Sequence, residues 1–136
     1  HTILPQCIFL HTEYCFGFTN LRPSVNGHCL ISPKRCVSYF DDLTEEEKHD
    51  LIHTARRVAN VIKKGFGTEG VGITMQDGPA AGQTVPHVHF HVIPRNFPTK
   101  WRKSPNLSLE QQEENTKQII EFFKLYDEEY DKNQEL

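Results

Sequence analysis

The segment His87-Val88-His89-Phe90-His91 places three histidines at alternate positions, separated by apolar residues. Side chains of a β-strand alternate between its two faces, so this spacing predicts three imidazoles on one face and Val88 and Phe90 on the other. Imidazole can act as a nucleophile, a general acid or base, or a metal ligand near neutral pH. The segment is therefore the leading candidate for a chemical site.

Three interpretations of these histidines differ in chemistry. They could be ordinary core or surface residues. They could bind zinc, with His28 as a further ligand, although strand spacing makes it hard for three alternate imidazoles to reach one ion at about 2.0 Å. They could also perform covalent catalysis, in which the middle imidazole attacks while its neighbours orient it and hold the electrophile.

The residues just before the histidines favour covalent catalysis at phosphorus. Residues 77–83 (DGPAAGQ) form a Gly-rich turn that runs directly into the histidine segment. Gly78, Gly82 and residues 83–85 can offer backbone N–H groups and a hydroxyl, which stabilise charge growing on phosphoryl oxygens. We therefore expect a phosphate-bearing small-molecule ligand, with zinc binding as the less favoured alternative.

Hydrophobic patterning predicts the elements that position this segment. Turn signals separate short β-rich runs, and Pro33 and Pro94 are each expected to end a strand. Short turns join most of the runs, so we expect an antiparallel sheet with helices on one side, an α+β fold. The predicted strands are two within residues 7–20, and then residues 28–32, 71–76 and 85–93.

Two helices are expected. Residues 44–64 carry one apolar stripe, and Thr44 and Glu47 can form a capping box at its start, with Gly65 as its stop. Residues 108–130 form the second helix. Its acidic last turn opposes the helix dipole, so we expect that end to fray.

Composition suits one soluble domain over residues 1–136. The formal net charge is −3, but residues 107–136 carry −6 and the rest +3. This mild basicity suits a phosphate-bearing ligand and is too weak for nucleic acid. No apolar run approaches the roughly 18–20 residues that span a bilayer, so no membrane association is expected. The four cysteines have no CxxC spacing, and we expect reduced thiols in a cytoplasmic protein.

The stretch from Met75 to Arg95 resembles the signature of the histidine triad (HIT) superfamily, and in detail its fragile histidine triad (Fhit) branch. Gln83-Thr84-Val85 and Pro94-Arg95 separate it from the Hint-like branch. Phe18-Thr19-Asn20 and Gly27-His28 agree as well. The resemblance implies the HIT fold, with a five-stranded antiparallel sheet and two helices, the sheet being extended across a homodimer through residues 44–64 and 71–76.

The resemblance also implies roles for individual residues. His89 corresponds to the nucleophile that takes the nucleoside monophosphate, His91 to a ligand of the attacked phosphate, and His87 to a residue whose carbonyl fixes the nucleophile's tautomer. His28 corresponds to a fourth histidine packed behind the triad. The implied substrate contacts are Asn20 to the ribose, Gln76 near the leaving group, Gly82, Gln83, Thr84 and Val85 at the phosphates, His1 near the base, and Ile3, Phe18 and Leu30 around the purine.

Alternatives to three of these roles stay open. Asn20 could simply shape a turn, Gln76 could be a polar residue at a strand end, and His28 could be structural. The chain also departs from animal Fhit proteins, because the short segment 96–107 contains no tyrosine. Phe90 stands where the family usually has a small aliphatic residue, and we expect the core to absorb it.

The activity implied is hydrolysis of diadenosine triphosphate to AMP and ADP through a nucleotidyl-histidine intermediate. The resemblance also implies that Mg²⁺ or Mn²⁺ travels with the substrate phosphates, so that no metal site built by the protein is needed. The alternatives are a purine nucleoside phosphoramidase of the Hint type and a slow-turnover nucleotide-binding protein that signals through its loaded complex.

Overall fold

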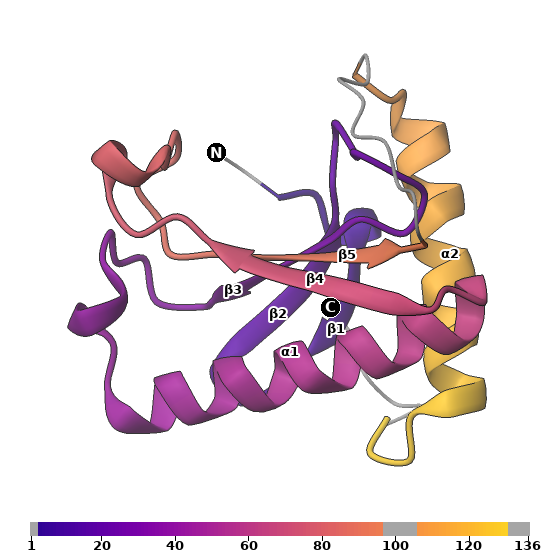
Figure 1. Cartoon of the computed structure of the whole chain (residues 1–136), viewed down its shortest axis with the longest axis horizontal. Coiled ribbons are helices and arrows are strands. Elements are labelled where there is room, and N and C mark those ends of the chain that lie inside the picture. Colours follow the sequence, from indigo (N-terminus) through magenta and orange to yellow (C-terminus); the bar gives the residue numbers. More distant parts are fainter. Residues whose placement is uncertain (1–2, 97–105, 131–136) are drawn as a thin grey trace.

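A computed structural model describes residues 3–96 and 106–130, and it contains the predicted five-stranded antiparallel sheet and two helices (Figure 1). The strands lie in the order β1-β2-β3-β5-β4, so β4 is an edge strand. The α+β fold class is confirmed. The strands are β1 (Ile8–His11), β2 (Cys15–Thr19), β3 (Cys29–Pro33), β4 (Gly70–Met75) and β5 (Phe90–Arg95).

Both helices lie on one face of the sheet. Helix α1 (Glu45–Phe66) packs against β3, β4 and β5, and α2 (Leu109–Tyr126) packs against β1 and β2 (Figure 1). The core between them is apolar, with Ile31 and Val92 from the sheet meeting Leu51 and Val58 of α1, all fully buried. Neither α1 nor α2 covers the other face of the sheet, so a ligand-binding site can form there. None of the helices described is long and apolar enough to cross a membrane.

Helix α1 begins as predicted and ends later. Thr44 accepts a hydrogen bond from the Glu47 N–H, and the Glu47 carboxylate accepts one from the Thr44 N–H, which completes the capping box. The prediction that Gly65 ends the helix was wrong, because the left-handed cap is Gly67 (φ 64°). Gly65 is needed for packing instead, since a Cβ there would lie 2.3 Å from Cδ2 of Phe122 on α2.

Helix α2 ends at Tyr126, four residues earlier than predicted. The acidic residues beyond it do not extend a fraying turn but form ion pairs with α1. Asp127 and Arg57 are both 7% exposed and lie 2.5 Å apart, and Glu129 also lies 3.4 Å from Nε of Arg57. Opposite charges on α1 therefore outweigh the unfavourable dipole at this end.

The histidine strand starts later than predicted. β5 covers Phe90–Arg95 rather than residues 85–93, so His87 and His89 precede it. The chain before Phe90 bonds elsewhere, because the Val88 N–H donates to the Val37 carbonyl and its carbonyl accepts from Ser32 Oγ, each at 2.8 Å. The prediction that Pro94 ends this strand was wrong, because β5 continues to Arg95 and Pro94 lies beyond the last pair with β3, where proline is tolerated.

Candidate active site

One rung of paired residues crosses all five strands on the face away from the helices. The register pairs Ile8 with Phe18, Phe18 with Leu30, Leu30 with His91, and His91 with Thr74. Paired residues on neighbouring strands point to the same face. His91 therefore lies between two groups. On one side are the apolar residues Ile8, Phe18 and Leu30, and on the other is the hydroxyl of the exposed Thr74.

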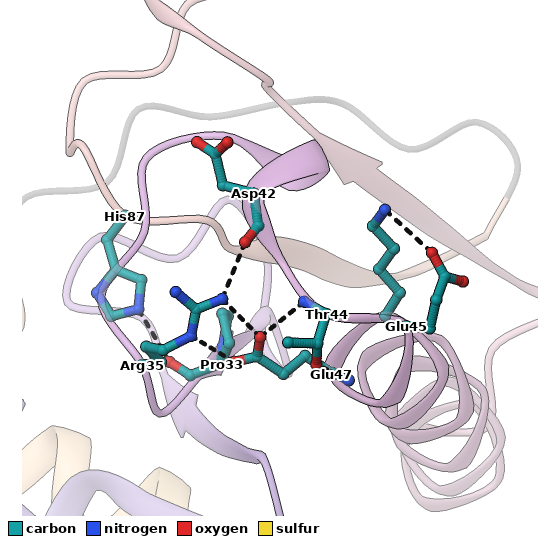
Figure 2. Close-up of polar contacts among 8 residues, drawn as sticks. Pro33, Arg35, Asp42, Thr44, Glu45, Glu47 and His87 are labelled. Carbon is teal, nitrogen blue, oxygen red and sulfur yellow. Dashed lines mark hydrogen bonds and ion pairs between the residues drawn. The ribbon is translucent and has the colours of Figure 1, made fainter.

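Two of the three triad histidines lie together and the third turns away. The rings of His89 and His91 are edge to face, with centroids 5.1 Å apart. His87 instead places Nε2 2.9 Å from the Pro33 carbonyl oxygen at the end of β3 (Figure 2). The prediction of three imidazoles in one row was wrong, because a regular strand does not begin until Phe90.

The tautomer of His89 follows from its hydrogen bond. Its Nδ1 lies 2.8 Å from the His87 carbonyl oxygen, which can only accept, so Nδ1 carries the proton. The neutral ring then has its lone pair on Nε2, as a nucleophile requires. His87 thus orients His89 through its backbone, and anchors itself by donating from Nε2 to Pro33.

The tautomer of His91 is set from farther away. The Ser24 N–H donates to His28 Nδ1 at 3.0 Å, so a neutral His28 carries its proton on Nε2. That Nε2–H lies 2.9 Å from His91 Nδ1 and donates to it. His91 therefore carries its own proton on Nε2, where it is available to a phosphate oxygen.

His28 and His91, the two histidines joined by this hydrogen bond, are both kept neutral by their surroundings. Burial, and to a smaller extent the neighbouring His91, lower the pKa of His28 to about 4. Burial, followed by the neighbouring His89, also lowers the pKa of His91. Near neutral pH each ring therefore has one proton, and the donor–acceptor order from Ser24 to His91 is unambiguous.

Asn20 lies beside His28 and also shapes a turn. Its Oδ1 accepts from the Arg22 N–H at 3.0 Å, and its Nδ2 lies 3.3 Å from His28 Nε2. The turn-shaping alternative is thus present in the structure. Contact with a ribose stays a prediction, and His1, expected near the base, lies outside the described residues.

The Gly-rich loop uses most of its own N–H groups. Residues 81–83 donate to the carbonyls of Gly78 and Pro79, forming a tight 3-10 turn. Within the part of the chain that the structure describes, the N–H groups of Thr84 and Val85 have no hydrogen-bond partner. These two, rather than Gln83, are the backbone donors that this loop can offer a phosphate.

Gln76 meets the same loop. It directly follows Met75, the last residue of β4, which pairs with Phe90 at the start of β5. Gly82 has φ +93°, and a Cβ there would lie 2.6 Å from Gln76 Nε2. The positive φ favours glycine at residue 82, and the absence of a Cβ lets the Gln76 side chain approach the loop closely.

Sequence reasoning missed the backbone groups that orient the histidines. The Ser24 N–H and the Pro33 carbonyl act through the main chain, so their residue types carry no signal. Phe90 behaves as expected: it is buried, with its ring stacked on that of Phe40. Among the described residues, no three His, Cys, Asp or Glu side chains are placed to hold a metal ion.

The comparisons with known proteins identify the family of this chain. The model of the HIT domain family matches residues 2–97, and the chain belongs to that family. The predicted resemblance to the Fhit branch is confirmed, because relatives 47% identical to this chain, from Caenorhabditis elegans and Drosophila melanogaster, are named nitrilase and fragile histidine triad fusion proteins.

One relative is a bis(5'-adenosyl)-triphosphatase from Dictyostelium discoideum, 48% identical over 65% of this chain and 59% of its own length. Another is an asymmetrical bis(5'-nucleosyl)-tetraphosphatase from Schizosaccharomyces pombe, 47% identical over 65% of this chain and 48% of its own length. The chain thus spans only about half the length of these relatives. Among solved structures, the diadenosine triphosphate hydrolase of Plasmodium falciparum, in complex with cyclomarin A, has a TM-score of 0.83 and 32% identity, covering 90% of this chain and 80% of that one.

Proposed function

We propose that the protein hydrolyses dinucleoside polyphosphates, with diadenosine triphosphate as preferred substrate. The observation that carries this proposal is the fixed tautomer of His89, which leaves a lone pair on Nε2, together with the ring of His91 at a centroid distance of 5.1 Å, whose tautomer leaves an N–H on its own Nε2. A nucleophile and a hydrogen-bond donor at one place suit attack on a phosphoryl group. The two relatives described above act on such substrates by name.

The reaction would run in two displacements. Nε2 of His89 forms a bond to the α-phosphorus as the bond to the bridging oxygen breaks, and ADP leaves. Water then attacks the same phosphorus, the N–P bond breaks, and AMP is released. In the adduct the imidazole is cationic, and the His87 carbonyl that accepts from its Nδ1–H stabilises that charge.

The chain's donors would act on the oxygens of the attacked phosphate. His91 Nε2–H and the N–H groups of Thr84 and Val85 are the candidates, because each is a donor whose proton is not used within the described part of the chain. Mg²⁺ or Mn²⁺ would enter as part of the substrate, bound by its phosphates. The apolar rung of Phe18 and Leu30, as predicted, with Ile8 rather than the predicted Ile3 paired beside them, would accept the purine.

Product analysis tests this proposal. The protein is incubated with diadenosine triphosphate and Mg²⁺, and with diadenosine tetraphosphate and adenosine phosphoramidate in parallel. Equal amounts of AMP and ADP from the triphosphate support the assignment. Faster cleavage of the tetraphosphate would show that the preferred substrate has four phosphates rather than three. Cleavage of the phosphoramidate alone would replace it with a Hint-type activity.

We also propose a homodimer formed through β4 and α1. A groove of about 480 Å³ lies between these elements, on the sheet face opposite the histidines, and its lining is mainly apolar. Ile52 and Ile73, which line it, are 54% and 47% exposed. β4 is also an edge strand, and pairing of two such edges would join two sheets into one. Sedimentation of an Ile73→Asp variant tests this.

A cytoplasmic location is part of the proposal. All four cysteines are unpaired thiols, which fits a reducing compartment. Fractionation of cells with an antibody to the protein tests this, and recovery in a secreted or membrane fraction would contradict it.

A further inference from the structure

The side chain of Gln83 is occupied within the protein. It is 8% exposed, and its Nε2 donates to the Ser38 carbonyl at 3.0 Å. Its Oε1 accepts from the Gly78 N–H, also at 3.0 Å, and its own N–H donates to the Gly78 carbonyl at 3.2 Å. One residue thus ties the two ends of the loop 78–83 to each other and to a different segment of the chain.

That segment, residues 38–40, holds the loop at further points. Ser38 Oγ donates to the Pro86 carbonyl at 3.3 Å, and the Phe40 N–H donates to Asp77 Oδ1 at 2.9 Å. The ring of Tyr39 covers Gly78 so closely that a Cβ on this glycine would lie 3.0 Å from Tyr39 Cε1. Contacts therefore hold the loop at Asp77 before its first glycine, at Gly78 itself and at Pro86 after its last glycine.

Segment 38–40 is itself anchored to the start of α1. Arg35 donates to both carboxylate oxygens of Glu47, at 2.7 and 3.2 Å, and to the Asp42 carbonyl at 2.9 Å (Figure 2). The same Glu47 accepts from the Thr44 N–H. Arg35 and Asp42, which flank segment 38–40, are thus linked by hydrogen bonds to Glu47, a buried residue in the otherwise exposed first turn of this 22-residue helix.

We propose that Gln83 is a positioning residue, whose side chain clasps the loop so that the N–H groups of Thr84 and Val85 face the phosphate. This differs from the phosphate-contacting role predicted for Gln83, because both its side chain and its backbone N–H are bonded within the protein. The clasp is a property of the protein without ligand, whereas its effect on turnover rests on the proposed hydrolase function. Donors fixed in advance stabilise the transition state without reorganisation, so loss of the clasp lowers kcat more than it raises KM.

Amide hydrogen exchange at Gly78 tests the clasp in the ligand-free protein. Gln83→Met keeps the length of the side chain but removes both hydrogen bonds, and exchange at Gly78 is expected to quicken by about tenfold or more. Gln83→Glu keeps an acceptor for Gly78, so protection there is expected to persist. The control is Thr84→Val, which changes a neighbouring side chain but leaves the clasp. Unchanged exchange at Gly78 in Gln83→Met would overturn the proposal.

Steady-state kinetics with diadenosine triphosphate test the positioning role. In Gln83→Met we expect kcat to fall by about tenfold with KM changed less than about threefold. A rise in KM alone, with Gly78 exchange unaltered, would show direct phosphate contact and contradict the clasp. Faster exchange with unchanged kcat would refute the positioning role. If the wild-type chain cleaves no dinucleotide, the proposed function fails, while the exchange experiment still decides the clasp.

Discussion

Nε2 of His28 lies 2.9 Å from Nδ1 of His91, and this contact determines which nitrogen of His91 bears the proton. The direction is fixed at its far end, because the Ser24 N–H can only donate to His28 Nδ1. A backbone amide in the turn before β3 therefore controls a donor on β5. His28 acts through His91, which makes it a positioning residue for the proposed reaction.

Replacing His28 with Phe should release the tautomer of His91. The apolar ring fills similar space but donates nothing to Nδ1, so we expect a mixture of His91 tautomers and a fall in kcat of about tenfold. Imidazole ¹⁵N shifts of His91, recorded without substrate, report the tautomer directly. Persistence of a single Nε2-protonated form in the variant would show that His28 does not set it.

Stability should fall as the pH is lowered from 6.5 to 4. The pKa of His28 is about 4 in the folded protein against an ordinary value near 6.5, so the unfolded chain binds this proton more readily. The loss accumulates across that window, reaches roughly 3 kcal/mol and then stops growing. His91 contributes in the same direction. Urea unfolding at several pH values measures the slope, which should be clearly smaller in His28→Phe.

A second acid-sensitive window should belong to Glu47. Hydrogen bonds from Arg35, and then from the Thr44 N–H, lower its pKa from an ordinary 4.5 to about 2. The stability contributed by the ionised carboxylate is complete above pH 4.5 and is lost as the pH falls to 2. Glu47→Gln should be less stable at pH 7 and show a flatter profile below 4.5. An unchanged slope there would mean that Arg35 does not favour the charged form.

Replacing His89 with Asn should nearly abolish turnover and leave substrate binding largely intact. Asn keeps an N–H for the His87 carbonyl but has no nucleophilic nitrogen, so kcat should fall by at least about 10³-fold. Calorimetry with the intact dinucleotide measures binding by the inactive variant. Turnover close to that of wild type would exclude the covalent route.

These expectations show which parts of the molecule could be foreseen. The capping box of Thr44 and Glu47 and the nucleophile His89 are local in sequence, so their spacing alone predicts them. The later start of β5 depends on Val37 and Ser32, which folding brings to Val88 from over 50 residues away. A glycine after an apolar stripe is typical of a helix end. Gly65 instead lies inside α1, where a side chain would collide with Phe122 of α2. Contacts of this kind leave no periodic pattern to read.

The groove between α1 and β4 gives a prediction independent of catalysis. Ile73 is nearly half exposed on an edge strand and lines this apolar surface, so a carboxylate there would be desolvated in any dimer that covers it. We expect Ile73→Asp to shift sedimentation from a dimer to a monomer without unfolding the chain.

The matched control for Ile73→Asp is Leu125→Asp, which adds the same charge at a 70% exposed leucine on α2, away from the groove. This variant should remain a dimer. If both variants stayed dimeric, a different surface would form the dimer. If the wild-type chain were already a monomer at micromolar concentration, the proposed homodimer would be wrong. Because the groove and the histidines lie on opposite faces of the sheet, the Ile73→Asp monomer should keep the His91 tautomer seen by ¹⁵N shifts. Loss of that tautomer on dissociation would instead show that the dimer is needed to hold the site together.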